Sequence, residues 1–293
     1  MARPERLSVV MPVRNGEQTL RRALTSTLLG LPDDAELVVV DDGSTDATAE
    51  VAARIRDPRL RFERSQGTPG VAGALNFGIE IASGHYLARM DADDICARGR
   101  FRRQLRTMAT ERVDLCFGSI LNFSPSAPWV LPSPPVPLTS EIVPWQLLLD
   151  NVLAHPTMLC RRQVLLDLGG YRATPAEDYD LWLRAAASGC RMRRTGRFEV
   201  AYRIHPDQVS GREAWRRDVL REPELVQSMT DLAAYLDLPY PADWARGRAD
   251  PHLVPESHRA ANARRIEEAM PALPKLRKLR MLAGEYLPST GSA

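Results

Sequence analysis

The sequence predicts an α/β fold, an open sheet flanked by helices, with a helical extension towards the C-terminus. Short apolar runs alternate with helical patterns through the first half of the chain, as expected when strands and helices follow one another. Two of these runs, residues 38–40 and 86–90, end in aspartates. Ligands of open α/β sheets collect at the carboxyl ends of the strands, so the aspartates predict one binding site there.

The elements of the first half follow from local signals. Residues 37–40 form a β-branched run typical of a strand that is buried on both faces. Gly43 permits the turn that follows, and Ser44, Thr45 or Asp46 can cap the next helix. In chain order we expect strand 7–11 ended by Pro12, a helix from residue 20, strand 37–40, helix 47–56, strand 60–63, helix 70–82 and strand 86–90.

The second half has weaker signals. Six prolines in residues 124–137 are too many for regular structure and predict a loop. We expect a strand over residues 200–204 and a helix over residues 213–237, with Pro223 as a break. Basic and apolar residues alternate at helical spacing in the tail, residues 259–280. Such a tail suits a solvated helix face, a homodimer contact or peripheral binding to an anionic membrane.

Composition excludes several classes of protein. The net charge of +2 gives no strong field for nucleic acid. No apolar run approaches the ~18–20 residues that span a bilayer, and the N-terminus lacks the apolar core of a signal peptide. Four widely spaced cysteines without a Cys-x-x-Cys pair predict reduced thiols. We therefore expect a cytoplasmic protein, one that at most touches the inner face of the membrane.

Three carboxylates, those of Asp91, Asp93 and Asp94, follow the apolar run 86–90 within four residues. They repel one another unless a cation or hydrogen-bond donors offset the charge, and hard oxygen ligands suit Mg²⁺ or Mn²⁺. The alternative is a solvated acidic turn that caps the next helix. Glycine-rich phosphate loops are missing from the sequence, which disfavours nucleotide-dependent dehydrogenases and P-loop kinases.

The chain resembles family 2 of the inverting glycosyltransferases, which have the GT-A fold with an open mixed sheet. The resemblance covers roughly residues 7 to 210 and is carried by the order and spacing of several short motifs. These are Val9-Val10-Met11-Pro12-Val13-Arg14-Asn15, Val39-Val40-Asp41-Asp42-Gly43-Ser44-Thr45-Asp46, Ala74-Leu75-Asn76-Phe77-Gly78-Ile79, Ala88-Arg89-Met90-Asp91-Ala92-Asp93-Asp94, His155-Pro156-Thr157, Gly169-Gly170-Tyr171, Glu177-Asp178-Tyr179-Asp180-Leu181-Trp182-Leu183-Arg184 and Tyr202-Arg203-Ile204-His205.

The resemblance implies a sugar transfer from a nucleotide-diphosphate sugar (a UDP, dTDP or GDP sugar) to a hydroxyl of a glycan or lipid-linked acceptor. It implies a glycosyltransferase domain over residues 1–210, with a donor half (1–123) and an acceptor half (124–210), before the extension 211–293. Asp178, with Glu177, would supply the catalytic base. Asp93 and Asp91 would hold Mn²⁺ or Mg²⁺, with Asp93 preferred as the direct ligand. The implied donor-binding residues are Pro12, Val13, Arg14, Asn15, Glu17, Asp41, Asp42, Asn76, Asp91 and Ala92.

The chain departs from the family pattern at three places. Arg14 stands where many relatives carry tyrosine, and Leu75 stands where many carry arginine, which removes a possible phosphate contact. The Gln-x-x-Arg-Trp motif of processive members is missing, so we expect one sugar per encounter. Competing hypotheses are a sugar-phosphate nucleotidyltransferase, which would need a glycine- and arginine-rich loop after the first strand, and a non-catalytic nucleotide-sugar or glycan-binding module.

Several single residues have two interpretations. Glu177 and Asp178 suit either a catalytic base or the cap of a helix. Trp182 can stack on a sugar ring of the acceptor or belong to the core, and His155 can face the acceptor or satisfy a local hydrogen bond. His205 can complete the metal site or lie at the surface. Arg89 would point to the same side as Asp91 and either pair with it or contact phosphate. Arg100 and Gln104 could brace the acidic turn.

Overall fold

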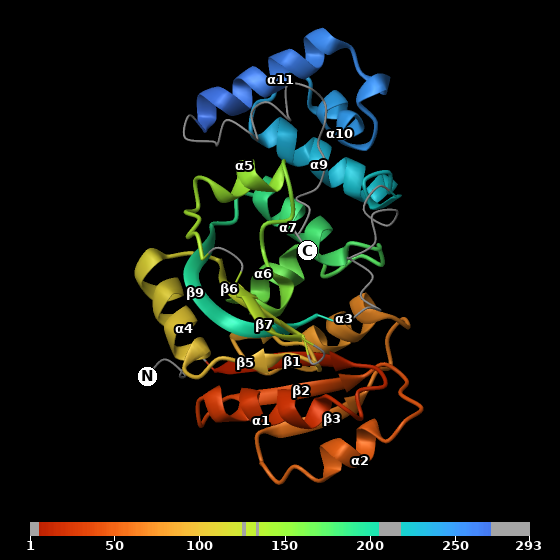
Figure 1. The fold of residues 1–293 in the computed structure, drawn as a ribbon, viewed down its shortest axis with the longest axis vertical. Helices are drawn as coiled ribbons and strands as arrows, with labels where there is room; N and C mark the ends of the chain where they lie inside the picture. Colours follow the sequence, from red (N-terminus) through yellow and green to blue (C-terminus); the bar gives the residue numbers. More distant parts are fainter. Residues whose placement is uncertain (1–5, 125–126, 133–134, 205–217, 271–293) are drawn as a thin grey trace. The chain divides into compact units, whose positions relative to one another are not determined.

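The computed structural model describes residues 6–124, 127–132, 135–204 and 218–270, which form two compact units (Figure 1). Unit 1 comprises Met1–Thr139, Leu153–Ala173 and Cys190–His205, and unit 2 comprises Ser140–Val152, Thr174–Gly189 and Pro206–Ala293. All strands of the described residues belong to unit 1, and the regular elements described in unit 2 are helices. The domain boundary at residue 210 stays a prediction.

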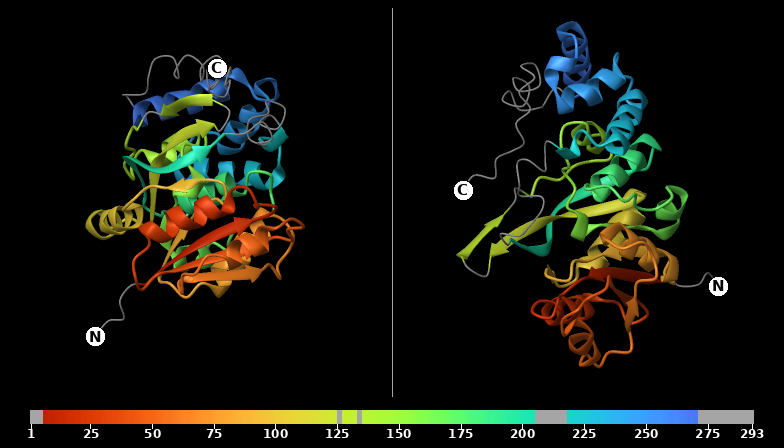
Figure 2. Two further views of the ribbon diagram at one scale, coloured as in Figure 1. Left: turned by 60° about the horizontal axis from the view of Figure 1, so that its bottom comes forward. Right: turned by 90° about the vertical axis from the view of Figure 1, so that its right-hand side faces the viewer.

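The described strands form one nine-stranded mixed sheet in the order β3-β2-β1-β4-β8-β6-β9-β5, with β7 paired to β6. Figure 2 gives two further views of the ribbon. Strands β3, β2, β1 and β4 are parallel to one another, whereas β8 runs antiparallel to both β4 and β6. The strands are β1 (Leu7–Val13), β2 (Glu36–Asp41), β3 (Leu60–Arg64), β4 (Tyr86–Arg89), β5 (Ile95–Cys96), β6 (Leu115–Ser124), β7 (Ala127–Pro132), β8 (Leu159–Arg161) and β9 (Met192–Arg203). The predicted fold class, an open mixed sheet flanked by helices, is confirmed.

Helices cover both faces of the β1–β4 part of the sheet. Unit 1 contains α1 (Leu20–Gly30), α2 (Thr48–Ala53), α3 (Val71–Ile81), α4 (Arg100–Glu111), α6 (Arg162–Asp167) and the 3₁₀ turn η1 (His155–Thr157). Side chains of α1 and α4 share a core with Val9, Met11 and Val39, whereas α3 packs on Val38 and Val40 of the opposite face. A Cβ on Gly78 of α3 would lie 2.4 Å from the side chain of Val10, so only glycine permits this close approach.

Unit 2 contains α5 (Val143–Leu147), α7 (Glu177–Ala187), α9 (Pro223–Tyr235), α10 (Pro241–Ala249), η3 (Pro251–Leu253) and α11 (Glu256–Ala269). Helix α9 packs against both α7 and α10, and α11 packs against α10. The buried carboxylate of Asp180 in α7 accepts a hydrogen bond from Ser228 of α9 at 2.7 Å and pairs with Arg184 at 2.8 Å. The bond to Ser228 therefore joins α7 to α9.

Two predictions based on proline were wrong. Residues 127–132 form strand β7 and not a loop, because β7 has only one neighbour among the described strands and an edge strand tolerates proline. Strand β1 continues through Pro12 to Val13, since Pro12 lies beyond the last partner of β1 in β4 and its missing N–H removes no bond there. The predicted break at Pro223 is confirmed: residues 218–219 are helical, residues 220–222 are not, and α9 begins at Pro223, because the first helical turn needs no N–H from proline.

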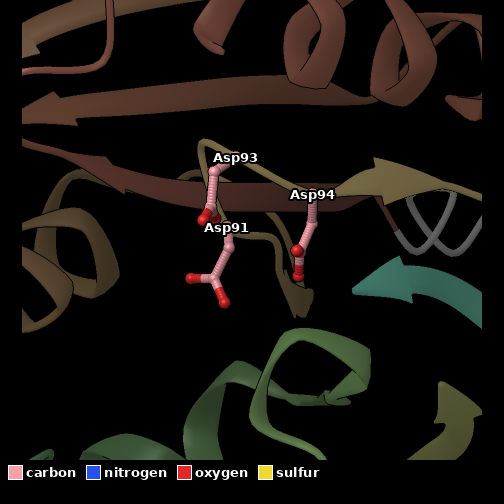
Figure 3. A group of neighbouring side chains, drawn as sticks. All are labelled: Asp91, Asp93 and Asp94. Atoms are coloured by element: carbon pink, nitrogen blue, oxygen red, sulfur yellow. The ribbon is translucent and has the colours of Figure 1, made fainter. Parts of the chain in front are cut away.

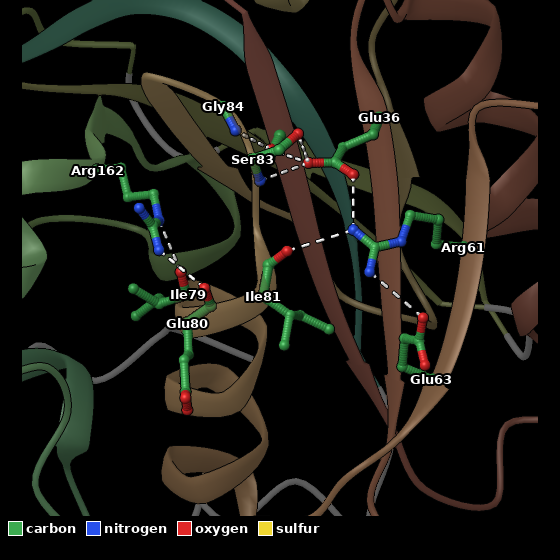
Figure 4. A network of polar contacts seen from close by, with 10 residues as sticks. Glu36, Arg61, Glu63, Ile79, Glu80, Ile81, Ser83, Gly84 and Arg162 are labelled. Carbon is green, nitrogen blue, oxygen red and sulfur yellow. Dashed lines mark hydrogen bonds and ion pairs between the residues drawn. The ribbon is translucent and has the colours of Figure 1, made fainter.

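A buried carboxylate fixes the amino ends of the first strands. Glu36 accepts hydrogen bonds from the hydroxyls of Ser8 and Ser83, from the Ser83 amide and from Arg61, all at 2.6–3.0 Å (Figure 4). The Ser8 hydroxyl also accepts from the amide of Gly84. Although burial alone would raise it, these donors hold the pKa of Glu36 at about 2. The network therefore joins β1, β2 and β3 to the turn from which β4 starts.

Helix α3 is held at both ends. Arg61 donates to the carbonyl of Ile81, and Arg162 donates to the carbonyls of Ile79 and Glu80, so two cations satisfy the last turn (Figure 4). At the other end the carboxylate of Asp42 accepts from the amide of Gly70, which precedes the helix. A carboxylate at the start of α3 and two guanidinium groups at its end thus match the helix dipole and hold the helix in place.

We predict that Glu36→Gln destabilises unit 1 by about 2 kcal/mol at pH 7, as expected for hydrogen bonds to a charged group. The folded pKa of Glu36 lies below the ordinary value of 4.5, so its contribution is complete above pH 4.5 and is lost as the pH falls towards 2. Urea unfolding of both proteins should therefore give a constant difference between pH 7 and 5 that shrinks below pH 4.5. Glu63→Gln is the control, because Glu63 is only half-buried and its contact with Arg61 is longer, at 3.4 Å. A pH-independent difference for Glu36→Gln would contradict the prediction.

Candidate active site

The two acidic strand ends lie on the same edge of the sheet. Strand β1 runs between β2 and β4, and all three are parallel. Asp41 ends β2 and pairs with Val13 at the end of β1. The residues 91–94 follow directly after β4, whose Arg89 pairs with Val10 of β1. The structure therefore brings Asp41 and the three aspartates that follow β4 to the same edge of the sheet, as the sequence predicted.

Asp91, Asp93 and Asp94 form an acidic cluster, which we call the acid turn (Figure 3). One carboxylate oxygen of each lies within 4.8 Å of the others. Asp94 is only 1% exposed; its Oδ1 accepts from the amide of Arg203, and its buried Oδ2 has no hydrogen-bond partner among the described residues. A buried carboxylate oxygen without a donor is costly unless a cation approaches it. Three hard oxygen donors around one point fit Mg²⁺ or Mn²⁺.

The crowded charges change the titration of their neighbours. Burial, and then the negative charges of Asp91 and Asp93, raise the pKa of Asp94 to about 9. Burial and the charges of Asp91 and Asp94 also raise the pKa of the Tyr202 phenol. Burial is the largest cause of both shifts, and the neighbouring carboxylates of the acid turn add to it. The sequence analysis counted Asp94 among three carboxylates suited to a cation, whereas the ligands implied by the resemblance were Asp93 and Asp91.

Two arginines hold the acid turn. Arg89 is buried and pairs with both oxygens of Asp91, at 2.5 and 2.6 Å. Of the two interpretations of Arg89, pairing with Asp91 or contact with phosphate, the structure favours the first. Arg203 of β9 donates to the backbone carbonyl of Asp93 at 3.0 Å, and its guanidinium lies 5.2 Å from the ring of Phe123. These contacts come from two strands, so the shape of the turn depends on the folded sheet.

Arg100 and Gln104 of α4 brace the strand that leads into the acid turn. The fully buried Arg100 donates to the carbonyls of Arg89 and Met158 at 2.9 and 3.2 Å. Gln104 accepts from Arg100 and donates to the carbonyls of Cys116 and Thr157. The pair thereby joins β4, β6 and η1.

The two loops predicted to bind the donor, after β1 and after β2, are joined by hydrogen bonds. The amide of Asn15 donates to the Ser44 hydroxyl at 2.8 Å, and the Asn15 side-chain carbonyl oxygen accepts from the amide of Thr45. Glu17 accepts from the amide of Ala47, and Asp41 accepts from the amide of Ser44. Arg14 is exposed, Pro12 and Ala92 are half-buried, and Val13 is buried. The donor-binding roles of these residues stay predictions, and the contacts show that Asn15 and Glu17 shape the rim.

Asn76 clamps a distant turn. Its side chain donates to the Tyr171 carbonyl and accepts from the Tyr171 amide, both at 2.8 Å. The Tyr171 hydroxyl lies 2.8 Å from Nε2 of His155. Burial, with the nearby charge of Arg89, lowers the pKa of His155 well below its ordinary value, so the imidazole is neutral. The structure thus satisfies His155 locally, and a role towards the acceptor stays a prediction.

The predicted base lies in unit 2. Helix α7 begins at Glu177, so Asp178 occupies its first turn, as predicted. Asp178 is half-buried, and its carboxylate accepts from Asn151 at 3.0 Å and from the amide of Tyr179 at 2.7 Å. Trp182 is fully buried and presents no ring face to a sugar, which favours the core alternative. His205 lies outside the described residues.

Comparisons with known proteins give one consistent result. The model of glycosyl transferase family 2 matches residues 8–169, more than half of the 293 residues. The chain is 28% identical over 229 residues to the UDP-Glc:alpha-D-GlcNAc-diphosphoundecaprenol beta-1,3-glucosyltransferase WfaP of Escherichia coli, covering 77% of this chain and 87% of the relative.

Two solved structures share the fold. S. aureus TarS 1-349 in complex with UDP-GlcNAc has a TM-score of 0.62 at 18% identity, covering 96% of this chain and 88% of that chain. The mannosyltransferase PcManGT from Pyrobaculum calidifontis, in complex with GDP-Man and Mn²⁺, has a TM-score of 0.57 at 20% identity, covering 94% and 78%. In the part of the chain that the structure describes, no helix combines the length and the apolar character needed to cross a bilayer.

We predict that Asn76→Ala costs about 1–3 kcal/mol of stability, because it leaves the amide and carbonyl of Tyr171 without their partner. Asn262→Ala is a matched control, since Asn262 makes the same two bonds with the backbone of Tyr240 in unit 2. Both variants should lose comparable stability in denaturant unfolding, but only Asn76→Ala should speed amide exchange at Tyr171. Equal protection of Tyr171 in both variants would contradict the proposed clamp.

Proposed function

Because the chain belongs to family 2 of the glycosyltransferases, we propose that it moves one sugar from a nucleotide-diphosphate donor to a hydroxyl of a lipid-linked glycan, with inversion. The observation that carries the catalytic part of this proposal is the acid turn, with the buried, unpartnered Oδ2 of Asp94 among the described residues. Carboxylates of the acid turn would hold a divalent cation there. PcManGT, which shares the fold, was solved with Mn²⁺, and this supports the choice of ion.

A UDP-sugar is our first candidate for the donor. WfaP is named for transfer from UDP-Glc, and TarS was crystallised with UDP-GlcNAc. Asp41 is suited to the base, because it lies 6% exposed at the rim and the Ser44 amide holds its Oδ1. A carboxylate accepts the N–H of uracil, and cytosine lacks that proton. Asp41 would therefore favour uridine and thymidine nucleotides over cytidine nucleotides.

The proposal for the acceptor is based on the similarity to WfaP. WfaP is named for a sugar linked through diphosphate to undecaprenol, a lipid. We propose an acceptor of the same kind, reached by the protein at the inner face of the membrane, with a single transfer for each encounter. The basic tail, for which a membrane contact was one of three interpretations, continues beyond residue 270 and there lies outside the described residues.

The chemistry needs a leaving-group stabiliser and a base. When bound, a divalent cation neutralises the negative charge that develops on the departing nucleoside diphosphate. Asp178 takes the proton of the acceptor hydroxyl as that oxygen bonds to the anomeric carbon and the bond from that carbon to the diphosphate breaks. A single displacement of this kind inverts the anomeric centre. Asn151 and the Tyr179 amide keep the Asp178 carboxylate oriented for this step.

The test of the proposal is donor turnover. We expect UDP-glucose to raise the melting temperature in the presence of Mn²⁺, with UDP and dTDP more effective than CDP. Transfer to a short lipid-linked N-acetylglucosamine diphosphate should need the metal and should stop when EDTA is added. Full transfer in EDTA would contradict the metal, and no shift with any nucleotide diphosphate would contradict the donor assignment.

We predict that Asp178→Asn leaves donor binding close to that of the wild type and slows transfer by ~10²–10⁴-fold, the range of a lost general base. Asp93→Asn should instead weaken Mn²⁺-dependent donor binding. Glu177→Gln is the neighbouring control and should keep transfer within about tenfold, because Asp178 remains. Donor affinity is measured by calorimetry and transfer by product formation. Full activity of Asp178→Asn would place the base elsewhere.

A further inference from the structure

The acid turn contains a cation of its own. Arg89 is the last residue of β4 and is 5% exposed. Its Nη1 donates to Oδ2 of Asp91 at 2.6 Å, and its Nη2 lies 2.5 Å from Oδ1 of the same carboxylate. Two parallel bonds of this kind fix the direction of a carboxylate as well as offsetting its charge. The pair forms because side chains two residues apart on an extended strand point to the same side.

Asp94 differs from Asp91 in its partners. Its Oδ1 accepts one backbone bond, from Arg203 at 2.8 Å, and its Oδ2 is buried with no hydrogen-bond donor among the described residues. The carboxylates of Asp93 and Asp94 extend from the same turn, and one oxygen of each lies within 4.8 Å of the other (Figure 3). The buried oxygen of Asp94 therefore needs a cation more than either oxygen of Asp91 does.

We propose that Arg89 is a positioning residue that removes Asp91 from the set of cation ligands, so that Asp93 and Asp94 bind the divalent ion. The assignment rests on the proposed function in one respect, namely that the acid turn binds such an ion. Asp91 then shapes the turn, and the Arg89–Asp91 pair adds no net charge to the site. The resemblance had named Asp93 and Asp91 as the ligands, with Asp93 preferred, and the sequence had left open whether Arg89 pairs with Asp91.

A charge-neutral double variant tests this assignment. Arg89→Met alone leaves Asp91 unpaired beside the site and should tighten Mn²⁺ binding. Asp91→Asn alone leaves the positive charge of Arg89 without that carboxylate and should weaken Mn²⁺ binding. In the double variant, Arg89→Met with Asp91→Asn, the two changes of charge cancel. If Asp91 is not a ligand, the double variant should bind Mn²⁺ within about threefold of the wild type, the scatter expected when compensating changes add.

The ligands themselves should behave differently. Asp93→Asn and Asp94→Asn should each weaken Mn²⁺ binding by about tenfold or more, since losses at metal ligands exceed those at the groups around them. Binding is measured without donor, from the signal of free Mn²⁺ in electron paramagnetic resonance, and folding of each variant is checked by circular dichroism and melting. Arg59→Met with Asp57→Asn is the matched control, because Arg59 pairs with both oxygens of Asp57 at 2.8 and 3.0 Å. That control should leave Mn²⁺ affinity unchanged.

Each contrary outcome has its own meaning. A double variant that loses Mn²⁺ as strongly as Asp94→Asn would make Asp91 a ligand and overturn the inference while leaving the proposed function intact. Unchanged binding by Asp94→Asn would overturn it as well. No Mn²⁺ binding by the wild type, with or without donor, would overturn both. If the double variant does not fold, Asp91→Asn decides, because a loss as large as that of Asp94→Asn contradicts the inference.

Discussion

Repulsion among three carboxylates at the end of β4 is the constraint that the rest of unit 1 resolves. Asp91, Asp93 and Asp94 place oxygens within 4.8 Å of one another, an arrangement that an isolated turn would avoid. The fold brings donors to it: Arg89 from the adjoining end of β4, and Arg203 from β9, which is distant in sequence. One buried oxygen of Asp94 is still left without a donor among the described residues. A structure that satisfies most but not all of a buried acidic site is preorganised for a cation.

The position of that turn depends on contacts at the opposite edge of the sheet. Glu36 joins β1, β2 and β3 to the Ser83–Gly84 turn, and β4 starts from this turn. Helix α3 is held by cations at its last turn and by Asp42 at its first. Because the interior is close-packed, with Gly78 directly against Val10, α3 cannot slide without moving β1. The helix in turn places Asn76 on Tyr171, so the clamp beside His155 is fixed by the same scaffold.

The sequence predicted the parts of this arrangement that have local signals. Apolar runs marked β2 and β4, and the aspartates that follow them share one rim, as expected from parallel strands. Features that depend on contacts between distant residues could not be predicted. Nothing local shows that β7 would lie at an edge, where its prolines are tolerated, or that Asn76 would meet a backbone 95 residues away. The Arg89–Asp91 pair was one of two interpretations, and only the folded structure could choose between them.

The use of arginine at these positions has a physical reason. Arg89 needs two parallel donors to hold one carboxylate, and Arg100 must reach the carbonyls of both Arg89 and Met158 from inside the core. The planar guanidinium offers five donors in fixed directions, and its charge persists when buried, whereas an ammonium group is a single point that loses its proton more readily. Lysine at position 89 would keep the charge beside the acid turn but lose the second bond, so the direction of Asp91 would no longer be fixed. The site therefore depends on the geometry of this cation as much as on its charge.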